Sequence, residues 1–225
     1  MKLRSFVGMA LIAAVTVPAS ASAQWLGLTQ SSAWEFSLAF GEVGRALSGT
    51  KVMGTRTFAA MDKRFSVGWG LRGSIMGGDN LPHMGRGDPR DTLFVSNPGV
   101  LALNAVVMGT ARLTGNIELG ANVDLLGISL GGDKRANLLA QGGALTGAQT
   151  ATVTNLNVFG FGTDNQRGSL LSEVFLQYGV NPEWKVRFGY SKFWTDYQID
   201  LVVDGSRRFR SSVTAAFIGA RYTPQ

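Results

Sequence analysis

The sequence predicts an all-β fold in which eight antiparallel strands form an up-and-down barrel. Large apolar residues recur at every second position in one segment after another. Successive side chains of a strand point to opposite faces, so this period gives each segment one apolar and one polar face. The 30 glycines are spread along the chain, where they would weaken helix interiors. Short and long breaks alternate between the apolar segments, as expected for consecutive hairpins.

The composition excludes several classes of protein. The chain has 225 residues, of which 45% are hydrophobic and 16% are charged, so a disordered protein is not expected. It has no cysteine, which excludes a disulfide scaffold and a thiolate metal site. The formal charge of +6 is not gathered into any basic block, so we expect no nucleic-acid partner.

Residues 1–23 have the pattern of a secretory signal peptide. Lys2 and Arg4 precede an apolar run over 6–17, and Ala21 and Ala23 form a small-residue cleavage signal. The run is too short to span a bilayer as a helix. We therefore expect an exported chain whose single domain covers residues 24–225.

The alternating segments and the breaks between them define the expected elements in order. The eight strands are expected at 33–41, 54–61, 64–76, 99–112, 117–130, 169–180, 184–198 and 210–222. Tight turn sequences stand at 61–63, 113–116 and 181–183, and long connections are expected at 42–53, 77–98, 132–168 and 200–209. This order places the tight turns and both termini at one end and the long loops at the other.

The polar faces of the strands favour a membrane barrel over a soluble one. They carry mostly glycine, serine, asparagine and isolated charges, whereas the outer face of a soluble barrel would be rich in lysine and glutamate. Aromatic residues such as Trp34, Trp184 and Tyr222 stand near strand ends, where a bilayer has its interfaces. A soluble periplasmic barrel that binds an apolar ligand stays open as an alternative.

Two segments and the last strand carry a resemblance to a known class. The segments 122–132 and 164–170, together with a final strand that ends near Tyr222, resemble small bacterial outer-membrane β-barrel proteins of the OmpA-type or opacity-like class. The resemblance implies a transmembrane barrel in the outer membrane of a Gram-negative bacterium, with short periplasmic turns and long extracellular loops. It also implies contact with outer-membrane lipid, lipopolysaccharide and the outer-membrane assembly machinery.

Charged residues on the polar faces predict an ion-pair network inside the barrel. Eight strands leave an interior just wide enough for side chains, and charges placed there must pair. The expected members are Glu35, Arg72, Arg112, Glu118, Asp124, Glu173, Arg187 and Arg221. Such a network would plug the lumen of a structural or surface-interaction protein. The alternative is a narrow channel for small or hydrophobic molecules.

The long connections suggest further contacts. Residues 136–163 carry no charge, so the loop at 132–168 could extend the barrel as strands, cover its mouth or meet an extracellular partner. Arg207, Arg208 and Arg210 could contact lipopolysaccharide phosphates.

No pattern of catalytic or metal-binding residues is recognisable. His83 is the only histidine, and the acids near it in sequence match no known metal-binding spacing. A lipid-modifying enzyme would depend on His83, but nothing in the sequence supplies the rest of such a site. We therefore expect no enzyme activity, no cofactor, no catalytic residue and no metal site.

Overall fold

The computed structural model describes residues 32–58, 64–86, 91–140, 145–160 and 166–224. Within these ranges every regular element is a strand and every strand pair is antiparallel, which confirms the expected all-β class. None of the described residues belongs to a helix with the length and apolar character needed to cross a membrane. The strands are β1 (Ala33–Phe40), β2 (Gly44–Phe58), β3 (Phe65–Gly78), β4 (Leu81–Gly85), β5 (Thr92–Val95), β6 (Gly99–Arg112), β7 (Ile117–Leu130), β8 (Lys134–Leu139), β9 (Leu145–Val153), β10 (Leu156–Val158), β11 (Leu170–Gly179), β12 (Trp184–Val203) and β13 (Ser206–Tyr222).

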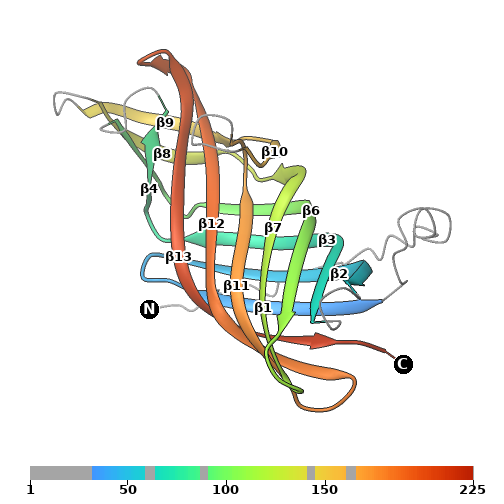
Figure 1. Cartoon of the computed structure of the whole chain (residues 1–225). Helices are drawn as coiled ribbons and strands as arrows, with labels where there is room; N and C mark the ends of the chain where they lie inside the picture. Colours follow the sequence, from blue (N-terminus) through green and yellow to red (C-terminus); the bar gives the residue numbers. More distant parts are fainter. Residues whose placement is uncertain (1–31, 59–63, 87–90, 141–144, 161–165, 225) are drawn as a thin grey trace.

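Eight of these strands are hydrogen-bonded neighbours in a closed circuit, whose course can be followed in Figure 1. Its order is β1, β2, β3, β6, β7, β11, β12 and β13, and β13 pairs back with β1. The closing pair runs from Trp34 opposite Tyr222 to Phe40 opposite Ala216. We call this group the eight-strand circuit.

A second circuit of six strands stands beyond the first. The upper parts of the long strands β12 and β13 pair there with β9 and β4, and β4, β5, β8 and β9 pair in succession (Figure 1). Its interior holds an apolar core in which Leu93, Leu138, Tyr197 and Phe209 are almost fully buried. We call this group the six-strand circuit. The short strand β10 pairs with β7 between the two circuits.

Most of the expected strand boundaries agree with the structure, but the number of strands does not. The expected strands at 33–41, 64–76, 99–112, 117–130 and 169–180 match β1, β3, β6, β7 and β11 within two residues at either end. The tight turns at 113–116 and 181–183 are confirmed. The turn at 61–63 lies outside the described residues. The residues that the structure describes form thirteen strands, where the sequence predicted eight.

Two of the expected long connections are wrong. The range 42–53 belongs mainly to β2, which begins at Gly44 after a short turn closed by the hydrogen bond from Gly41 N to Gly44 O at 2.8 Å. Its inward residues are small or polar, so the segment lacks the large apolar residues that mark the other strands. The range 200–209 is a strand extension closed by Asp204 and Gly205, which both have positive φ, as a type I′ hairpin turn requires.

The other two expected connections contain strands of their own. The range 77–98 contains β4 and β5, and the range 132–168 contains β8, β9 and β10. Of the possibilities considered for the uncharged loop, extension of the barrel by strands is therefore the one that the structure adopts. These additional strands account for the difference between eight and thirteen.

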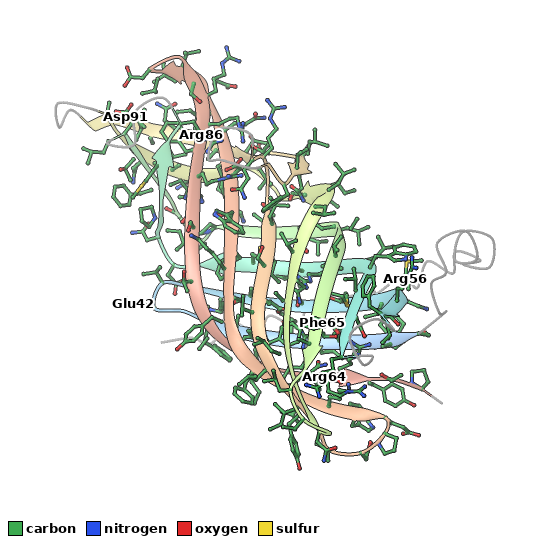
Figure 2. All side chains as sticks on the ribbon, viewed as in Figure 1. Glu42, Arg56, Arg64, Phe65, Arg86 and Asp91 are labelled. Carbon is green, nitrogen blue, oxygen red and sulfur yellow. The ribbon has the colours of Figure 1, made fainter. Side chains whose placement is uncertain are left out.

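The outer face of the eight-strand circuit carries large apolar side chains, whereas its interior holds buried charged and polar side chains together with an apolar cluster. Figure 2 draws these side chains on the ribbon. On β1, Phe36 and Leu38 are exposed, whereas Glu35 and Ser37 between them are buried. This alternation is the reverse of the usual arrangement in a soluble protein, in which charged residues are almost never fully buried. Because of this alternation, the charged side chains of the eight strands meet in the interior, where the candidate functional residues lie.

Candidate functional site

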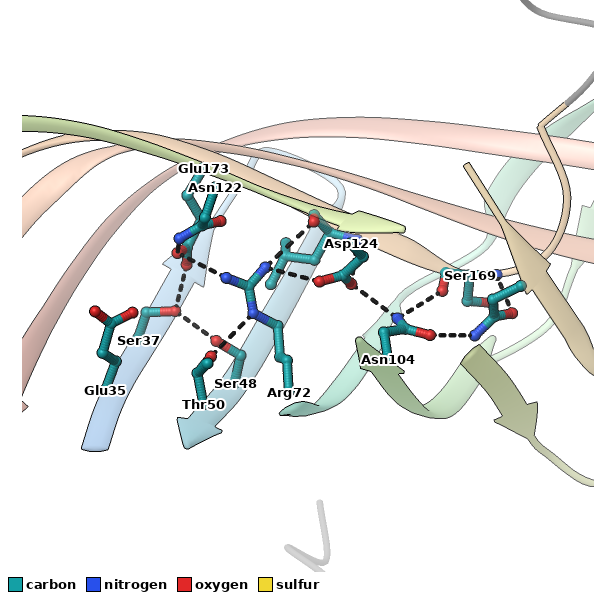
Figure 3. A network of polar contacts seen from close by, with 12 residues as sticks. Glu35, Ser37, Ser48, Thr50, Arg72, Asn104, Asn122, Asp124, Ser169 and Glu173 are labelled. Carbon is teal, nitrogen blue, oxygen red and sulfur yellow. Dashed lines mark hydrogen bonds and ion pairs between the residues drawn. The ribbon is translucent and has the colours of Figure 1, made fainter. Parts of the chain in front are cut away.

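Among the described residues, five charged side chains in the interior of the eight-strand circuit are at most 2% exposed. They are Glu35 on β1, Arg72 on β3, Asp124 on β7, Glu173 on β11 and Arg187 on β12. Each stands at an inward position of the period-two alternation, so strands distant in sequence bring them together. Figure 3 shows four of them, Glu35, Arg72, Asp124 and Glu173. We call these five residues the interior charge cluster.

Arg72 lies at the centre of the cluster. Its Nη1 is 3.1 Å from Asp124 Oδ1 and its Nη2 is 3.4 Å from Glu173 Oε2. Its Nε donates a hydrogen bond to Thr50 Oγ1, and Nη1 donates another to the carbonyl oxygen of Leu171. A buried guanidinium is costly unless its donors are satisfied, and here each of its nitrogen atoms has a partner.

Arg187 on β12 connects Glu173 on β11 with Glu35 on β1. Its Nη1 is 2.8 Å from Glu35 Oε2, and its Nη2 is 3.3 Å from Glu173 Oε2. Glu173 also accepts hydrogen bonds from Ser37 Oγ at 2.6 Å and Asn122 Nδ2 at 2.7 Å. Glu173 is therefore shared by both buried arginines, and removing either of them leaves it only partly compensated.

A chain of amides continues from Asp124 toward β10. Asn104 donates to Asp124 Oδ2 at 2.8 Å and accepts from Asn157 Nδ2 at 2.7 Å (Figure 3). Asn157 in turn accepts hydrogen bonds from Ser129 Oγ and from the backbone N–H of Ser169, both at 2.8 Å. Sequence reasoning missed Asn157, since it lay in a range expected to be a loop.

A smaller charge group lies where β6, β7 and β12 approach the tight turns. Glu118 Oε1 and Oε2 each lie 2.8 Å from Lys185 Nζ, and Oε1 is 3.8 Å from Arg112 Nε. Gln177 also donates to Glu118. Arg221 Nη1 lies 3.2 Å from Glu35 Oε1 and so connects to the interior charge cluster.

The structure thus brings the eight expected lumen residues into two groups. Arg221 and the five members of the interior charge cluster form one connected set, whereas Arg112 and Glu118 form the other. The Arg112 side chain is 55% exposed, so it lies at the rim and not in the interior. Lys185 was not among the expected members, although it stands on the polar face of its strand.

The arginines near the β12–β13 turn are directed at an acid of the same chain. Arg210 Nε lies 2.7 Å from Asp196 Oδ1, and Arg208 also contacts that carboxylate. Arg210 Nη1 donates to Gln166 Oε1 at 2.8 Å, whereas Arg207 is exposed. The lipopolysaccharide contact expected from Arg207, Arg208 and Arg210 stays a prediction.

His83 lies on β4 inside the six-strand circuit and is fully buried. One ring nitrogen is 2.9 Å from the carbonyl oxygen of Leu81 and the other is 3.0 Å from Thr195 Oγ1. Burial lowers the pKa of His83 to about 4, so the ring is neutral near pH 7. A ring enclosed in this way offers no face to a substrate. Among the described residues, no three His, Asp or Glu side chains are placed to hold a metal ion.

Comparisons with known proteins find likeness only among solved structures. No family model matches the chain and no curated protein sequence matches it. Neisserial surface protein A is 10% identical with a TM-score of 0.37, over 86% of this chain and 95% of that one. The attachment invasion locus protein Ail of Yersinia pestis is 11% identical with a TM-score of 0.31, over 87% and 100%. The monoaromatic hydrocarbon channel CymD is 7% identical with a TM-score of 0.25, over 90% and 91%. These scores are too low to carry an argument about fold or function.

Proposed function

We propose that this protein is an integral outer-membrane β-barrel whose eight-strand circuit spans the bilayer and whose lumen is plugged. Its role in this proposal is structural or one of surface interaction, without enzyme activity. The single observation that carries the proposal is the reversed arrangement of the eight-strand circuit, with apolar side chains outside and charges inside. In lipid every backbone polar group needs a partner within the protein, and a closed circuit of strands supplies it.

The outward apolar residues form a continuous belt. On neighbouring strands β11, β12, β13 and β1, large side chains remain 40–59% exposed at Val174, Phe188, Ile218 and Leu38. A soluble monomer rarely exposes so extended an apolar surface. Lipid contact accounts for the belt and, at the same time, for the burial of the interior charge cluster.

Aromatic and basic residues bound the belt at both ends. At the end with the tight turns, Lys51 Nζ lies 4.9 Å from the ring centre of Trp34, and Trp184 packs on Tyr222 with their ring centres 4.8 Å apart. Toward the other end, Lys192 Nζ lies 5.5 Å from the ring centre of Trp194. Tryptophan and tyrosine favour the interfaces of a bilayer, and lysine reaches from there to water.

Packing of the interior supports a plugged lumen over an open channel. The interior charge cluster packs directly against an apolar cluster that includes Leu171, Phe175, Phe193 and Phe217, and both are almost fully buried. Opening a path through the circuit would separate buried ion pairs and leave uncompensated charges. The narrow channel is therefore the second candidate, and the soluble periplasmic barrel the third.

Localisation and gel mobility test the membrane assignment first. We expect the protein in the outer-membrane fraction, with a mobility on gels that changes when the sample is boiled. Recovery in the osmotic-shock fraction without a mobility shift would contradict the proposal and favour the soluble binder. Planar-bilayer recordings of the folded protein then separate a plugged lumen, which gives no steady conductance, from a channel.

The proposal includes partners that follow from the location. Outer-membrane lipid and lipopolysaccharide would surround the belt, and the outer-membrane assembly machinery would insert the strands. An extracellular partner would meet the outer surface of the range 132–168, which carries β8 and β9 of the six-strand circuit. Removal of the signal peptide at residues 1–23 belongs to the same proposal.

A further inference from the structure

A small pocket opens at the end of the eight-strand circuit that carries the tight turns. Its volume is about 130 Å³, enough for one compact ion with some of its water. The ends of β2, β3, β6, β7, β12 and β13 enclose it. The described residues that line it include the charged side chains Arg112, Glu118, Lys185 and Arg221 and the hydroxyls of Thr55, Ser66 and Thr110. Figure 2 labels Arg64 and Phe65 at this end of the molecule.

Positive charge is in excess at this pocket. The two charge groups described above contain five basic side chains and four carboxylates. They are Arg72, Arg112, Lys185, Arg187 and Arg221 on one side and Glu35, Glu118, Asp124 and Glu173 on the other. The fully buried pairs of Arg72 and Arg187 with Asp124 and Glu173 balance one another. Glu35 is shared by Arg187 at 2.8 Å and Arg221 at 3.2 Å. The rim cations Arg112, Lys185 and Arg221 therefore have Glu118 and only part of the charge of Glu35 to balance them.

Two arginines that line the pocket retain hydrogen-bonding capacity. Among the described residues, the buried Nε of Arg221 has no hydrogen-bond partner, although this side chain is only 12% exposed. Arg112 is half exposed, and its ion pair with Glu118 is long at 3.8 Å. The guanidinium of Arg112 can therefore donate to an acceptor that enters the pocket, and the positive charge of Arg221 adds to the attraction.

The acid in the pocket does not favour a cation there. Both oxygens of Glu118 already lie 2.8 Å from Lys185 Nζ, and Gln177 donates to the same carboxylate. An entering cation would have to displace Lys185, whereas an entering anion would meet guanidinium and hydroxyl donors. Arginine binds oxyanions well, because its planar fork matches their geometry.

We infer that this pocket binds a compact oxyanion of the phosphate or carboxylate type at the rim of the barrel. Arg112 and Arg221 supply the charged donors, and the hydroxyls of Thr110 and Ser66 supply neutral ones. The inference rests on the proposed function in one respect only, which is that this end of the barrel faces the periplasm. The pocket itself depends solely on the fold of the eight-strand circuit.

Calorimetric titration of the folded protein in detergent tests the inference. Inorganic phosphate and acetate are titrated separately at pH 7 and low ionic strength, so that the two kinds of oxyanion are distinguished. We expect saturable binding of at least one of them, and Arg112→Gln should weaken it about tenfold, as expected for the loss of one charge-assisted hydrogen bond. Arg112→Lys keeps the charge without the fork and should retain part of the affinity.

Arg45→Gln is the matched control, because Arg45 pairs with Asp79 at the opposite end of the circuit and is 70% exposed. It removes the same charge and should leave binding unchanged. Each variant is first checked for the mobility shift on boiling. A protein that shows the shift but binds neither anion, or binds equally well in Arg112→Gln, overturns the inference and leaves the membrane proposal intact. Failure of the shift itself overturns the membrane proposal, while the titration still decides whether the pocket binds.

Discussion

The guanidinium of Arg187 lies on the ring of Phe175, with its central carbon 3.8 Å from the ring centre. The same guanidinium holds Glu35 and Glu173 through its two terminal nitrogens. One side chain thus joins the apolar cluster of the interior to the interior charge cluster. Cation–π contact is strongest where water is excluded, and Arg187 is only 1% exposed.

We expect Arg187→Met to lower the free energy of unfolding by about 3–5 kcal/mol, because the substitution leaves two buried carboxylates undercompensated. Methionine retains much of the packing on Phe175, so the loss would report mainly on charge. Urea titration of the folded protein in vesicles, followed by tryptophan fluorescence, measures the change. Adding Glu35→Gln should recover part of the loss. If the Arg187→Met variant is as stable as the parent, the interior charge cluster does not stabilise the eight-strand circuit.

The apolar belt leads to a prediction that separates a membrane barrel from a soluble one. Phe188 stands midway along the belt on β12 and is 52% exposed. In a bilayer, Phe188→Arg should cost about 2–4 kcal/mol, because an arginine at the midplane loses its hydration. Val202→Arg is the control, since Val202 is 54% exposed on the same strand beyond the belt. Equal and small losses in both variants, measured by the same titration, would argue for a soluble barrel.

Much of the eight-strand circuit could be predicted from the sequence, because alternation and turn residues are local patterns. Period two and turn residues located β6 and β7 to the residue, and the polar faces identified Arg72, Asp124 and Glu173 as inward-facing. Under the proposed function, each strand of the circuit presents an apolar face to lipid along its length, and this requirement accounts for the strength of the alternation.

The rest of the fold depends on contacts that no local pattern records. The first half of β2 faces inward with Ala46, Ser48 and Thr50, which pack against neighbouring strands but resemble a loop in sequence. The six-strand circuit requires β4 to meet β13 and β9 to meet β12, and these pairings join ranges far apart in the chain. Asn157 could not be predicted either, because it reaches the site only through the pairing of β10 with β7.

Burial of His83 makes stability depend on pH. Its pKa falls from 6.5 to about 4 on folding, so below pH 6.5 the unfolded chain binds a proton that the folded chain does not. The contribution of His83 to the free energy of unfolding is therefore constant above pH 6.5. It declines as the pH falls toward 4, by roughly 3 kcal/mol in total. The neighbouring carboxylate Asp196 favours the charged ring but does not overcome burial.

Urea titrations of the parent and of His83→Gln at pH 7.5, 5.5 and 4 test this expectation. Glutamine places its amide near the position of Nε2, where it can keep the hydrogen bond to Thr195, and it does not titrate. The variant should therefore lose less stability than the parent as the pH falls. Other groups contribute equally to both proteins and cancel in the difference. Parallel curves for the two proteins would mean that His83 does not remain neutral in the folded state.

Gly168 fixes the segment that carries Asn157 against the barrel. Its φ of +72° is unfavourable for other residues, and a Cβ there would lie 2.0 Å from Asn157 Oδ1. We expect Gly168→Ala to displace Asn157 from Asn104 and to increase amide hydrogen exchange in β10, while the eight-strand circuit persists. Gly205→Ala is the matched control, because Gly205 has a φ of +75° with no atom within 4 Å of the added carbon. Both variants carry the backbone strain, of about 1–2 kcal/mol, but only Gly168→Ala carries the steric conflict. Equal exchange in β10 for the two variants would show that the close fit around Asn157 does not hold that strand in place.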